Sequence, residues 1–400
     1  MTMAKDDKWQ LYVVRGFGKD KFDPSQIEAG LALELQPQLH LAPMAQGSEV
    51  FRDLVSYIDS NPEVSFEFVD AKGEFLGDTE SLSASLETIV DINSALKKPR
   101  ITHAIFKAGA LQTHEEKHRL MREEGYSPEA AAFLNKEYLN GLEKAKKNIQ
   151  AFKEEASVSS ITLLIENVYP ANFDIVEGTE EKPKELQDAD LRWGKTRWMP
   201  SIIQLGDIGV VHDLKHLCLG ICLDIEHFEG AIEYSKLHNQ TNRPTEHSWE
   251  LSPLEKDLWY EYGIFIARGY PIDFDSEINR SRAIEQMPEI PIAHLGGQVN
   301  MFYYDIFQGE RVPVIGSHMP ITGPYEENEF IRDPSLREKM GEIRIQNLQE
   351  YLSSLHEKGT RKAVLEHHVG EYTGPKWDKY TKMSRDNVRR TLQDIGAQVT

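Results

Sequence analysis

Acidic and histidine side chains end four short apolar runs of this chain, and their types suit metal or proton chemistry. The runs read LLIEN, CLDIEH, AHLGG and LEHH, and their polar residues are Glu166, Asp224, His294 and Glu366. A short apolar run bounded by polar residues is typical of a buried strand. Each of the four side chains is therefore expected at the end of a strand, at the mouth of a dry interior.

These four groups would be costly to gather by themselves. An isolated charge in a dry site costs several kcal/mol, and neighbouring carboxylates repel one another. A divalent cation removes that cost, and mixed carboxylate and imidazole ligands suit Mn²⁺, Zn²⁺, Fe²⁺ or Co²⁺, with Mg²⁺ kept as a fifth candidate. One such residue alone is as readily a helix cap or a structural histidine, but four at successive strand ends favour a metal ion.

Short β-branched runs alternate with longer helical patterns along the chain, which is typical of βα units around a parallel sheet. Eight segments fit strands, the number that a closed (β/α)₈ barrel requires: residues 9–14, 31–35, 65–69, 101–106, 161–165, 219–223, 290–293 and 363–365. Helices are expected over residues 128–156, 202–217 and 336–358, with a last helix that begins at Ser384 as its N-cap. We therefore predict an α/β fold, in which residues 1–400 form one (β/α)₈ TIM barrel domain.

Two connections are too long for a minimal barrel. Residues 168–200 follow the fifth expected strand, and residues 228–289 follow the sixth. Loops that follow barrel strands build the active-site face, so both insertions are candidates for lids or specificity elements. Decoration, or contact with a second copy of the chain in a homo-oligomer, is the alternative, above all for the second insertion.

The four motifs, in this order and at barrel spacing, resemble the xylose isomerase-like TIM barrel superfamily, which includes sugar isomerases, ketose 3-epimerases and endonuclease IV. Glu-Asn after the fifth strand and Asp-x-x-His after the sixth are the most specific motifs. The resemblance implies that Glu166, Asp224, His294 and Glu366 bind one divalent metal ion. It also implies that Glu166 and Glu366 exchange a proton with the substrate. His227 would face the substrate, as in epimerases, or bind a second metal ion, as in endonuclease IV.

Other positions depart from the endonuclease IV pattern. His103 matches a histidine of that family on the fourth strand, but the third strand offers no histidine, and Gly316, Ser317 and His318 stand where an Asp-x-His motif is expected. The resemblance thus favours an isomerase or epimerase of carbohydrate metabolism that removes a proton next to a carbonyl, with His103 and His318 as substrate-binding residues. The alternatives are a metal-dependent phosphoesterase related to endonuclease IV and a barrel that only binds a ligand.

The first long connection carries a basic cluster, RWGKTRW, in an otherwise acidic protein. Arg192 and Arg197 are candidates to hold a phosphate or carboxylate of the substrate, since arginine binds such anions in a bidentate manner. The alternative is a solvated rim segment anchored by Trp193 and Trp198. Lys107, after the fourth strand, is a weaker candidate to line the mouth.

Composition limits the class of partner. The 400 residues carry 45 Lys and Arg against 65 Asp and Glu, a formal net charge of −20. Binding to nucleic acid needs a Lys/Arg surface, so we expect a small-molecule substrate, a sugar or related polyol, and not nucleic acid.

No stretch approaches the ~20 apolar residues of a membrane span, and the first residues lack a signal-type apolar core. Cys218 and Cys222 lie in an apolar run and are expected to be reduced and buried, which favours the cytoplasm.

Overall fold

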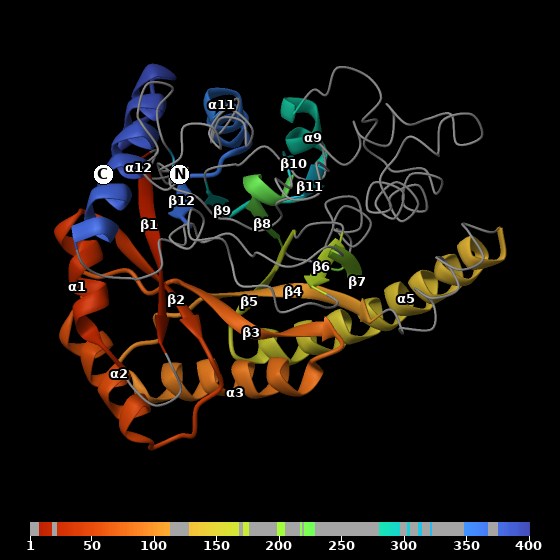
Figure 1. Cartoon of the computed structure of the whole chain (residues 1–400). Coiled ribbons are helices and arrows are strands. Elements are labelled where there is room, and N and C mark those ends of the chain that lie inside the picture. Colours follow the sequence, from red (N-terminus) through yellow and green to blue (C-terminus); the bar gives the residue numbers. More distant parts are fainter. Residues whose placement is uncertain are drawn as a thin grey trace, which may run out of the picture.

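Eight parallel strands close into a barrel, as the sequence predicts. The strands are β1 (Lys8–Phe17), β2 (Gln36–Leu41), β3 (Phe68–Leu76), β4 (His103–Gln112), β5 (Thr162–Glu166), β8 (Ile221–Asp224), β9 (Ile292–Leu295) and β12 (Lys362–Leu365). Each strand pairs in parallel with the next in this order, and β12 pairs with β1 to close the ring. The fold is therefore a (β/α)₈ TIM barrel (Figure 1).

The structure is a computed structural model. It describes residues 8–17, 22–112, 128–167, 171–175, 198–204, 217, 220–228, 280–296, 302–304, 311–313, 321, 348–366 and 375–400. The 228–289 insertion lies outside these residues apart from its two ends, and only the ends of the 168–200 insertion are described. No helix among the described residues is both long and apolar enough to span a membrane.

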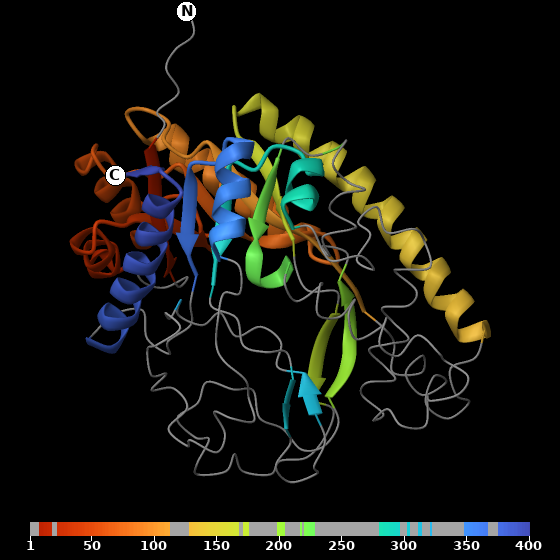
Figure 2. The ribbon, with the colours of Figure 1, turned by 90° about the horizontal axis from the view of Figure 1, so that it is seen from above.

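Helices cover the outside of the barrel (Figures 1 and 2). They are α1 (Pro24–Ala32), α2 (Glu49–Ser60), α3 (Thr79–Ala95), α5 (Pro128–Val158), α9 (Arg280–Gln286), α11 (Leu348–Lys358) and α12 (Pro375–Asp394). Asp23, Ser48 and Asp78 are the N-caps of α1, α2 and α3, and each side chain accepts a hydrogen bond from a backbone N–H of the first turn. The local sequence thus fixes where these helices begin.

Apolar residues form two layers around the strands. A large cluster lies between the barrel and its helices, and a smaller one fills the barrel interior with Tyr12, Phe68, Ile105, Leu164, Cys222, Ile292 and Val364. Seven of the eight barrel strands supply one residue each to this interior cluster. The exception is β2, whose Leu39 and Leu41 belong to the outer cluster. On its other face β2 carries Gln36, Gln38 and His40, and Gln38 is fully buried.

The fourth strand runs on beyond the barrel. Its last residues pair in antiparallel fashion with β7 (Trp198–Gln204), which pairs with β6 (Ala171–Ile175). Both strands lie beyond the carboxyl ends of the barrel strands (Figure 2). Gly109 allows this course, because its φ is +109° and a Cβ there would lie 2.2 Å from the Leu76 carbonyl oxygen. The helix expected over residues 202–217 is wrong for residues 202–204, which belong to β7, and most of the remainder lies outside the described residues.

Two further expected elements are misplaced, and the strand expected over residues 65–69 overlaps β3 only at its last two residues. Residues 31–35 are not a strand: α1 runs to Ala32, Glu34 adopts a φ of +58°, and the strand is β2 instead. The last helix does not begin at Ser384, because α12 begins at Pro375. Ser384 is buried within that helix, where its Oγ accepts a hydrogen bond from the Ile321 amide. A tertiary contact therefore satisfies the hydroxyl that the sequence suggests as a cap.

The remaining strands are short. β13 (Gln398–Val399) extends the sheet by pairing in parallel with the first residues of β1, and β10 (Phe302–Tyr304) forms an antiparallel pair with β11 (Arg311–Pro313). Of the helix expected over residues 336–358, the structure describes the second half, which is α11. Residues 336–347 lie outside the described residues.

Candidate metal centre

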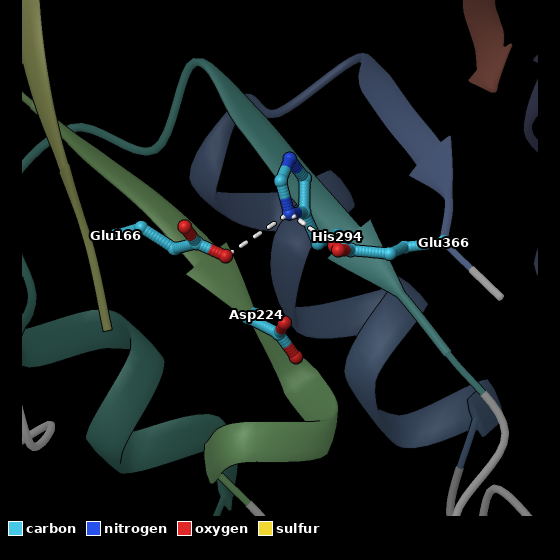
Figure 3. A group of neighbouring side chains, drawn as sticks. All are labelled: Glu166, Asp224, His294 and Glu366. Carbon is cyan, nitrogen blue, oxygen red and sulfur yellow. Dashed lines mark ion pairs between the residues drawn. The ribbon is translucent and has the colours of Figure 1, made fainter. Parts of the chain in front are cut away.

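The structure brings the four strand-end residues together at the carboxyl end of the barrel. Glu166 and Asp224 are the last residues of β5 and β8, His294 lies in β9, and Glu366 directly follows β12. One ligand atom from each of these residues lies within 4.8 Å of the other three (Figure 3). The strands β12, β9, β8 and β5 are neighbours in the sheet. Their parallel direction therefore delivers all four side chains to one point.

The imidazole of His294 stands between two of the carboxylates. Its Nδ1 lies 2.7 Å from Glu366 Oε2 and 3.3 Å from Glu166 Oε1 (Figure 3). Burial alone would lower the pKa of His294, but Cys222, the Glu366 carboxylate and the contact with Glu166 raise it well above its usual value. Without a metal ion, a proton on His294 therefore offsets part of the negative charge.

The backbone of Asp224 is fastened to the end of β5 by Asn167. The Asn167 side-chain amide donates a hydrogen bond to the Asp224 carbonyl oxygen at 2.9 Å, and the Asp224 N–H donates one to Asn167 Oδ1 at 2.7 Å. These two bonds continue the pairing of β5 with β8 past the last strand residues. Asp224 is thereby held beside Glu166, and Asn167, the second residue of the Glu-Asn motif, is a positioning residue.

His227 lies one helical turn after Asp224. Asp224 Oδ1 accepts hydrogen bonds from the backbone N–H groups of Glu226 and His227, which starts this turn in the manner of an N-cap. The His227 Nδ1 lies 2.7 Å from the carbonyl oxygen of Asn167. Because a carbonyl oxygen only accepts, Nδ1 carries a proton, and in the neutral ring Nε2 is then an acceptor. The Asp-x-x-His spacing thus places a second imidazole beside the four clustered residues.

Lys107 supplies a cation beside the cluster. It is level with Glu166 in the pairing of β4 with β5, and its Nζ lies 4.0 Å from Glu166 Oε2. The Glu166 carboxylate raises the pKa of Lys107 above its usual value, which keeps the ammonium group charged. Burial opposes ionisation of Glu166, but Lys107 and His294 outweigh it and lower the pKa of Glu166 to about 2. Glu166 is therefore an anion throughout the neutral range.

Asp70, in β3, belongs to the same electrostatic neighbourhood. Burial raises the pKa of its carboxyl group, with Glu166 adding to the shift and His40 opposing it. His40 Nδ1 lies 3.9 Å from Asp70 Oδ2. The strands on this side of the mouth therefore carry polar groups of both signs, whereas the four clustered residues supply three carboxylates and one imidazole.

Replacing Lys107 with Met is expected to tighten binding of a divalent ion about tenfold, equivalent to about 1.4 kcal/mol. The ammonium group lies close enough to Glu166 to compete with a metal ion for its negative charge. Titration calorimetry with Mn²⁺ measures this effect. Lys72→Met, at an exposed position of β3, is the matched control and should leave the affinity unchanged. Weaker binding by Lys107→Met would mean that the lysine supports the site in another way.

The donor set fits a divalent metal ion. Three carboxylates and one imidazole are ligands that Mn²⁺, Zn²⁺, Fe²⁺ and Co²⁺ accept, and ligand atoms that surround one ion must lie within a few ångströms of one another. Glu166 Oε2 is buried and accepts no hydrogen bond from the described residues, and the Lys107 ammonium group beside it is 4.0 Å away. A buried carboxylate oxygen in this state is costly unless a cation or donor meets it.

His103 does not join these residues. It is the first residue of β4 and pairs with Thr162, whereas Lys107 of the same strand pairs with Glu166. Four residues of strand place the two levels about 13 Å apart. The His103 ring stacks on Phe68, and its Nδ1 lies 3.6 Å from Glu67 Oε1. His103 therefore lies at the start of β4, away from the four clustered residues, and its role as a substrate-binding residue stays a prediction.

The other expected substrate contacts cannot be placed. His318, Arg192 and Arg197 lie outside the described residues. Cys222 is buried in β8 as expected, where burial raises the pKa of its thiol to about 12, and Cys218 lies outside the described part. The structure also places Gln38 at the site, where its side chain contacts His294. Nothing in the sequence around Gln38 indicated this contact.

No family model matches the sequence, and no curated protein matches it. Solved structures with a similar fold include endonuclease IV from Thermus thermophilus, with 13% identity over 96% of this chain and 99% of that chain and a TM-score of 0.43. L-Ribulose 3-epimerase matches with 8% identity, 97% and 96% coverage and a TM-score of 0.48. D-Psicose 3-epimerase from Clostridium cellulolyticum matches with 10% identity, 96% and 99% coverage and a TM-score of 0.45.

These likenesses are distant, and they concern the course of the chain and not its activity. They extend over nearly the whole length of both partners.

Proposed function

We propose that this protein is a divalent-metal-dependent isomerase or epimerase that acts on a sugar or a related polyol. One observation carries the proposal: four ligand atoms from neighbouring parallel strands lie within 4.8 Å of one another at the carboxyl end of a barrel. Active sites of TIM barrels lie at this end. The substrate in this proposal is a small molecule. A barrel that only binds a ligand is the alternative, and it assigns no catalytic role to the four clustered residues.

Glu166, Asp224, His294 and Glu366 would hold the metal ion, with Nδ1 as the ligand atom of His294. A divalent ion at this place supplies Lewis-acid polarisation of neighbouring carbonyl and hydroxyl oxygens. The chain itself must supply the groups that move protons and the groups that orient the substrate. The described residues offer candidates for both tasks.

Glu166 and Glu366 are the candidates for moving a proton at the carbon next to the carbonyl. They approach His294 from two sides, since they come from β5 and from the end of β12. A carboxyl group must be ionised to accept a proton. Lys107 and His294 keep Glu166 in that form by lowering its pKa to about 2, and the same shift makes its carboxylate a weaker base. With two carboxylates, one side chain can remove the proton and the other can return one to the opposite face.

His227 is the candidate for orienting a substrate hydroxyl. Its Nδ1 donates a hydrogen bond to the Asn167 carbonyl oxygen, so that Nε2 of the neutral ring accepts. An acceptor suits a hydroxyl group of the substrate. It does not suit a developing oxyanion, which needs a donor. A neutral His227 would thus accept a hydrogen bond from a hydroxyl group of the substrate.

Metal binding is expected to release about one proton per ion at pH 7. Nδ1 of His294 can bind a metal ion only after it loses its proton, and the pKa of His294 lies well above its usual value. Affinity should therefore rise with pH through the neutral range. Calorimetry in two buffers of different ionisation enthalpy counts the protons. His103→Asn, which alters a histidine at the other end of β4, should leave the count unchanged, and a count near zero in the unaltered protein would contradict the protonated state of His294.

The activity is tested by incubating the metal-loaded protein with a panel of sugars in D₂O. Removal and return of a proton through Glu166 or Glu366 should place solvent deuterium on the carbon next to the carbonyl, which mass spectrometry and NMR detect. Glu366→Gln should lose both turnover and exchange. Turnover without deuterium would exclude proton abstraction, and a panel that yields no turnover in the metal-loaded protein would count against a sugar as the substrate.

The number of bound ions separates this proposal from a phosphoesterase that uses two or three ions. About one tightly bound ion per chain supports the isomerase or epimerase. Of the additional histidines that a second ion would need, His227 lies beside the cluster and His103 lies at the far end of β4. This arrangement of the described residues favours a single ion.

A further inference from the structure

Gln38 is the polar residue that β2 places inside the barrel. Every other barrel strand supplies an apolar side chain to the interior cluster, but the inward face of β2 carries Gln36, Gln38 and His40. Gln38 is fully buried. Burial of an amide without hydrogen bonds costs roughly 1–3 kcal/mol by mutational measures. An amide at this position therefore calls for a partner inside the barrel.

That partner is His294. The Gln38 side chain lies 3.0 Å from His294 Nε2 through its Nε2 and 3.1 Å through its Oε1. Strands β2 and β9 are not neighbours, because β1 and β12 lie between them in the sheet. The contact thus spans the barrel interior, and it meets the ring nitrogen opposite to the one that faces Glu166 and Glu366.

The two ring nitrogens have linked roles. A neutral imidazole carries one N–H and one lone pair. If Nε2–H donates to Gln38 Oε1, the lone pair belongs to Nδ1 and points toward the carboxylates. In the protonated ring of the metal-free protein, Nε2–H likewise donates to Gln38 Oε1 while Nδ1–H faces Glu366. The same acceptor on Gln38 therefore serves the ring before and after Nδ1 loses its proton.

We propose that Gln38 is a positioning residue that holds the His294 ring with Nδ1 toward Glu166 and Glu366 and thereby selects Nδ1 as the metal-binding atom. This inference rests on the metal centre described above. It extends that centre across the barrel to a strand that supplies no ligand. Partners of this kind typically change metal affinity 10- to 100-fold when they are removed.

Three substitutions test the proposal. Gln38→Met keeps the length and apolar bulk but removes the hydrogen bond, and Gln38→Asn keeps the amide but is too short to reach. Gln38→Glu keeps an acceptor for Nε2–H. Gln36→Met is the matched control, because Gln36 lies in the same strand and its Oε1 accepts a hydrogen bond from the Ser65 backbone and not from His294.

Zn²⁺ and Mn²⁺ affinities are measured by titration calorimetry, after circular dichroism has shown that each variant is folded. Gln38→Met and Gln38→Asn should bind about 10- to 100-fold more weakly. Gln38→Glu should bind at least as tightly as the unaltered protein, and Gln36→Met should be unchanged. The ¹⁵N spectrum of histidine-labelled, Zn²⁺-loaded protein should show a protonated Nε2 and a metal-bound Nδ1, and Gln38→Met should lose this signature. His294 is assigned by comparison with a His294→Asn variant.

Unchanged affinity and an unchanged ¹⁵N signature in Gln38→Met would overturn the proposal. So would a Gln38→Glu variant that binds as weakly as Gln38→Met, since that result would make bulk and not hydrogen bonding the cause. If Gln38→Met does not fold, Gln38→Asn and Gln38→Glu decide between the same outcomes. Failure of the metal centre itself is distinguishable, because the unaltered protein would then bind neither ion, and both proposals would fall together.

Discussion

Replacing Glu366 with Gln is expected to weaken Mn²⁺ or Zn²⁺ binding at least about 100-fold, equivalent to about 2.7 kcal/mol. The change removes one of three negative ligands and keeps the size of the side chain. It also removes the carboxylate that lies 2.7 Å from His294 Nδ1, which is the nitrogen assigned to the metal ion. Titration calorimetry on chelator-treated protein measures the affinity.

Glu67→Gln is the matched control for this substitution. Glu67 lies at the opposite end of the barrel, where it forms ion pairs with Lys362 and His103. The same chemical change there should leave the metal affinity unaltered, although it also removes a carboxylate that forms ion pairs. Equal losses in the two variants would show that general charge, and not the four-residue cluster, governs binding.

The second large effect concerns stability without metal. Glu166→Gln is expected to lower the free energy of unfolding of the metal-free protein by about 3 kcal/mol at pH 7. The reason is that Lys107 and His294 lower the pKa of Glu166 from about 4.5 to about 2, and each pKa unit corresponds to about 1.4 kcal/mol. Urea unfolding in the presence of a chelator measures it. Glu87→Gln, on the exposed face of α3, should change stability little.

The contribution of the ionised Glu166 side chain to the stability of the metal-free protein depends on pH in a definite direction. Because the folded-state pKa of Glu166 is lowered, its contribution is fully present above about pH 4.5 and is lost as the pH falls toward 2. Glu166→Gln should therefore lose less stability than the unaltered protein over this acidic range. His294 acts in the opposite direction, since its raised pKa stabilises the metal-free protein at low pH and this term fades as the pH rises. Parallel acid profiles for the two proteins would contradict the assigned role of Lys107.

Much of the barrel could be predicted because local sequence carries it. β5, β8 and β9 are short apolar runs, and Glu166, Asp224 and His294 end them or lie near their ends. The carboxyl ends of parallel strands lie at the same end of a barrel. These three residues, together with Glu366 after β12, are therefore expected to cluster there. The same reasoning does not bring His103 to this point, because His103 lies near the start of the expected strand and is the first residue of β4.

The second strand shows why part of the site stayed hidden. The segment of β2 reads QPQLHL. Its proline and its inward-facing polar residues make the alternation of apolar and polar residues typical of a strand hard to recognise in the sequence. The neighbouring apolar segment looked more like a strand but ends α1. Gln38 is inward and polar because it meets His294 across the barrel, so the residue that broke the pattern is one that the site needs. Only the tertiary structure reveals such a partner.

Anomalous diffraction from crystals soaked in Mn²⁺ or Zn²⁺ tests the central claim most directly. The account predicts one strong peak per chain, about 2.0–2.3 Å from Glu166, Asp224, Glu366 and Nδ1 of His294. Soaked crystals of Glu366→Gln should lose that peak. An ion bound elsewhere, or no ion at this place in crystals of the unaltered protein at saturating metal, would contradict the assignment of these four residues as a metal centre.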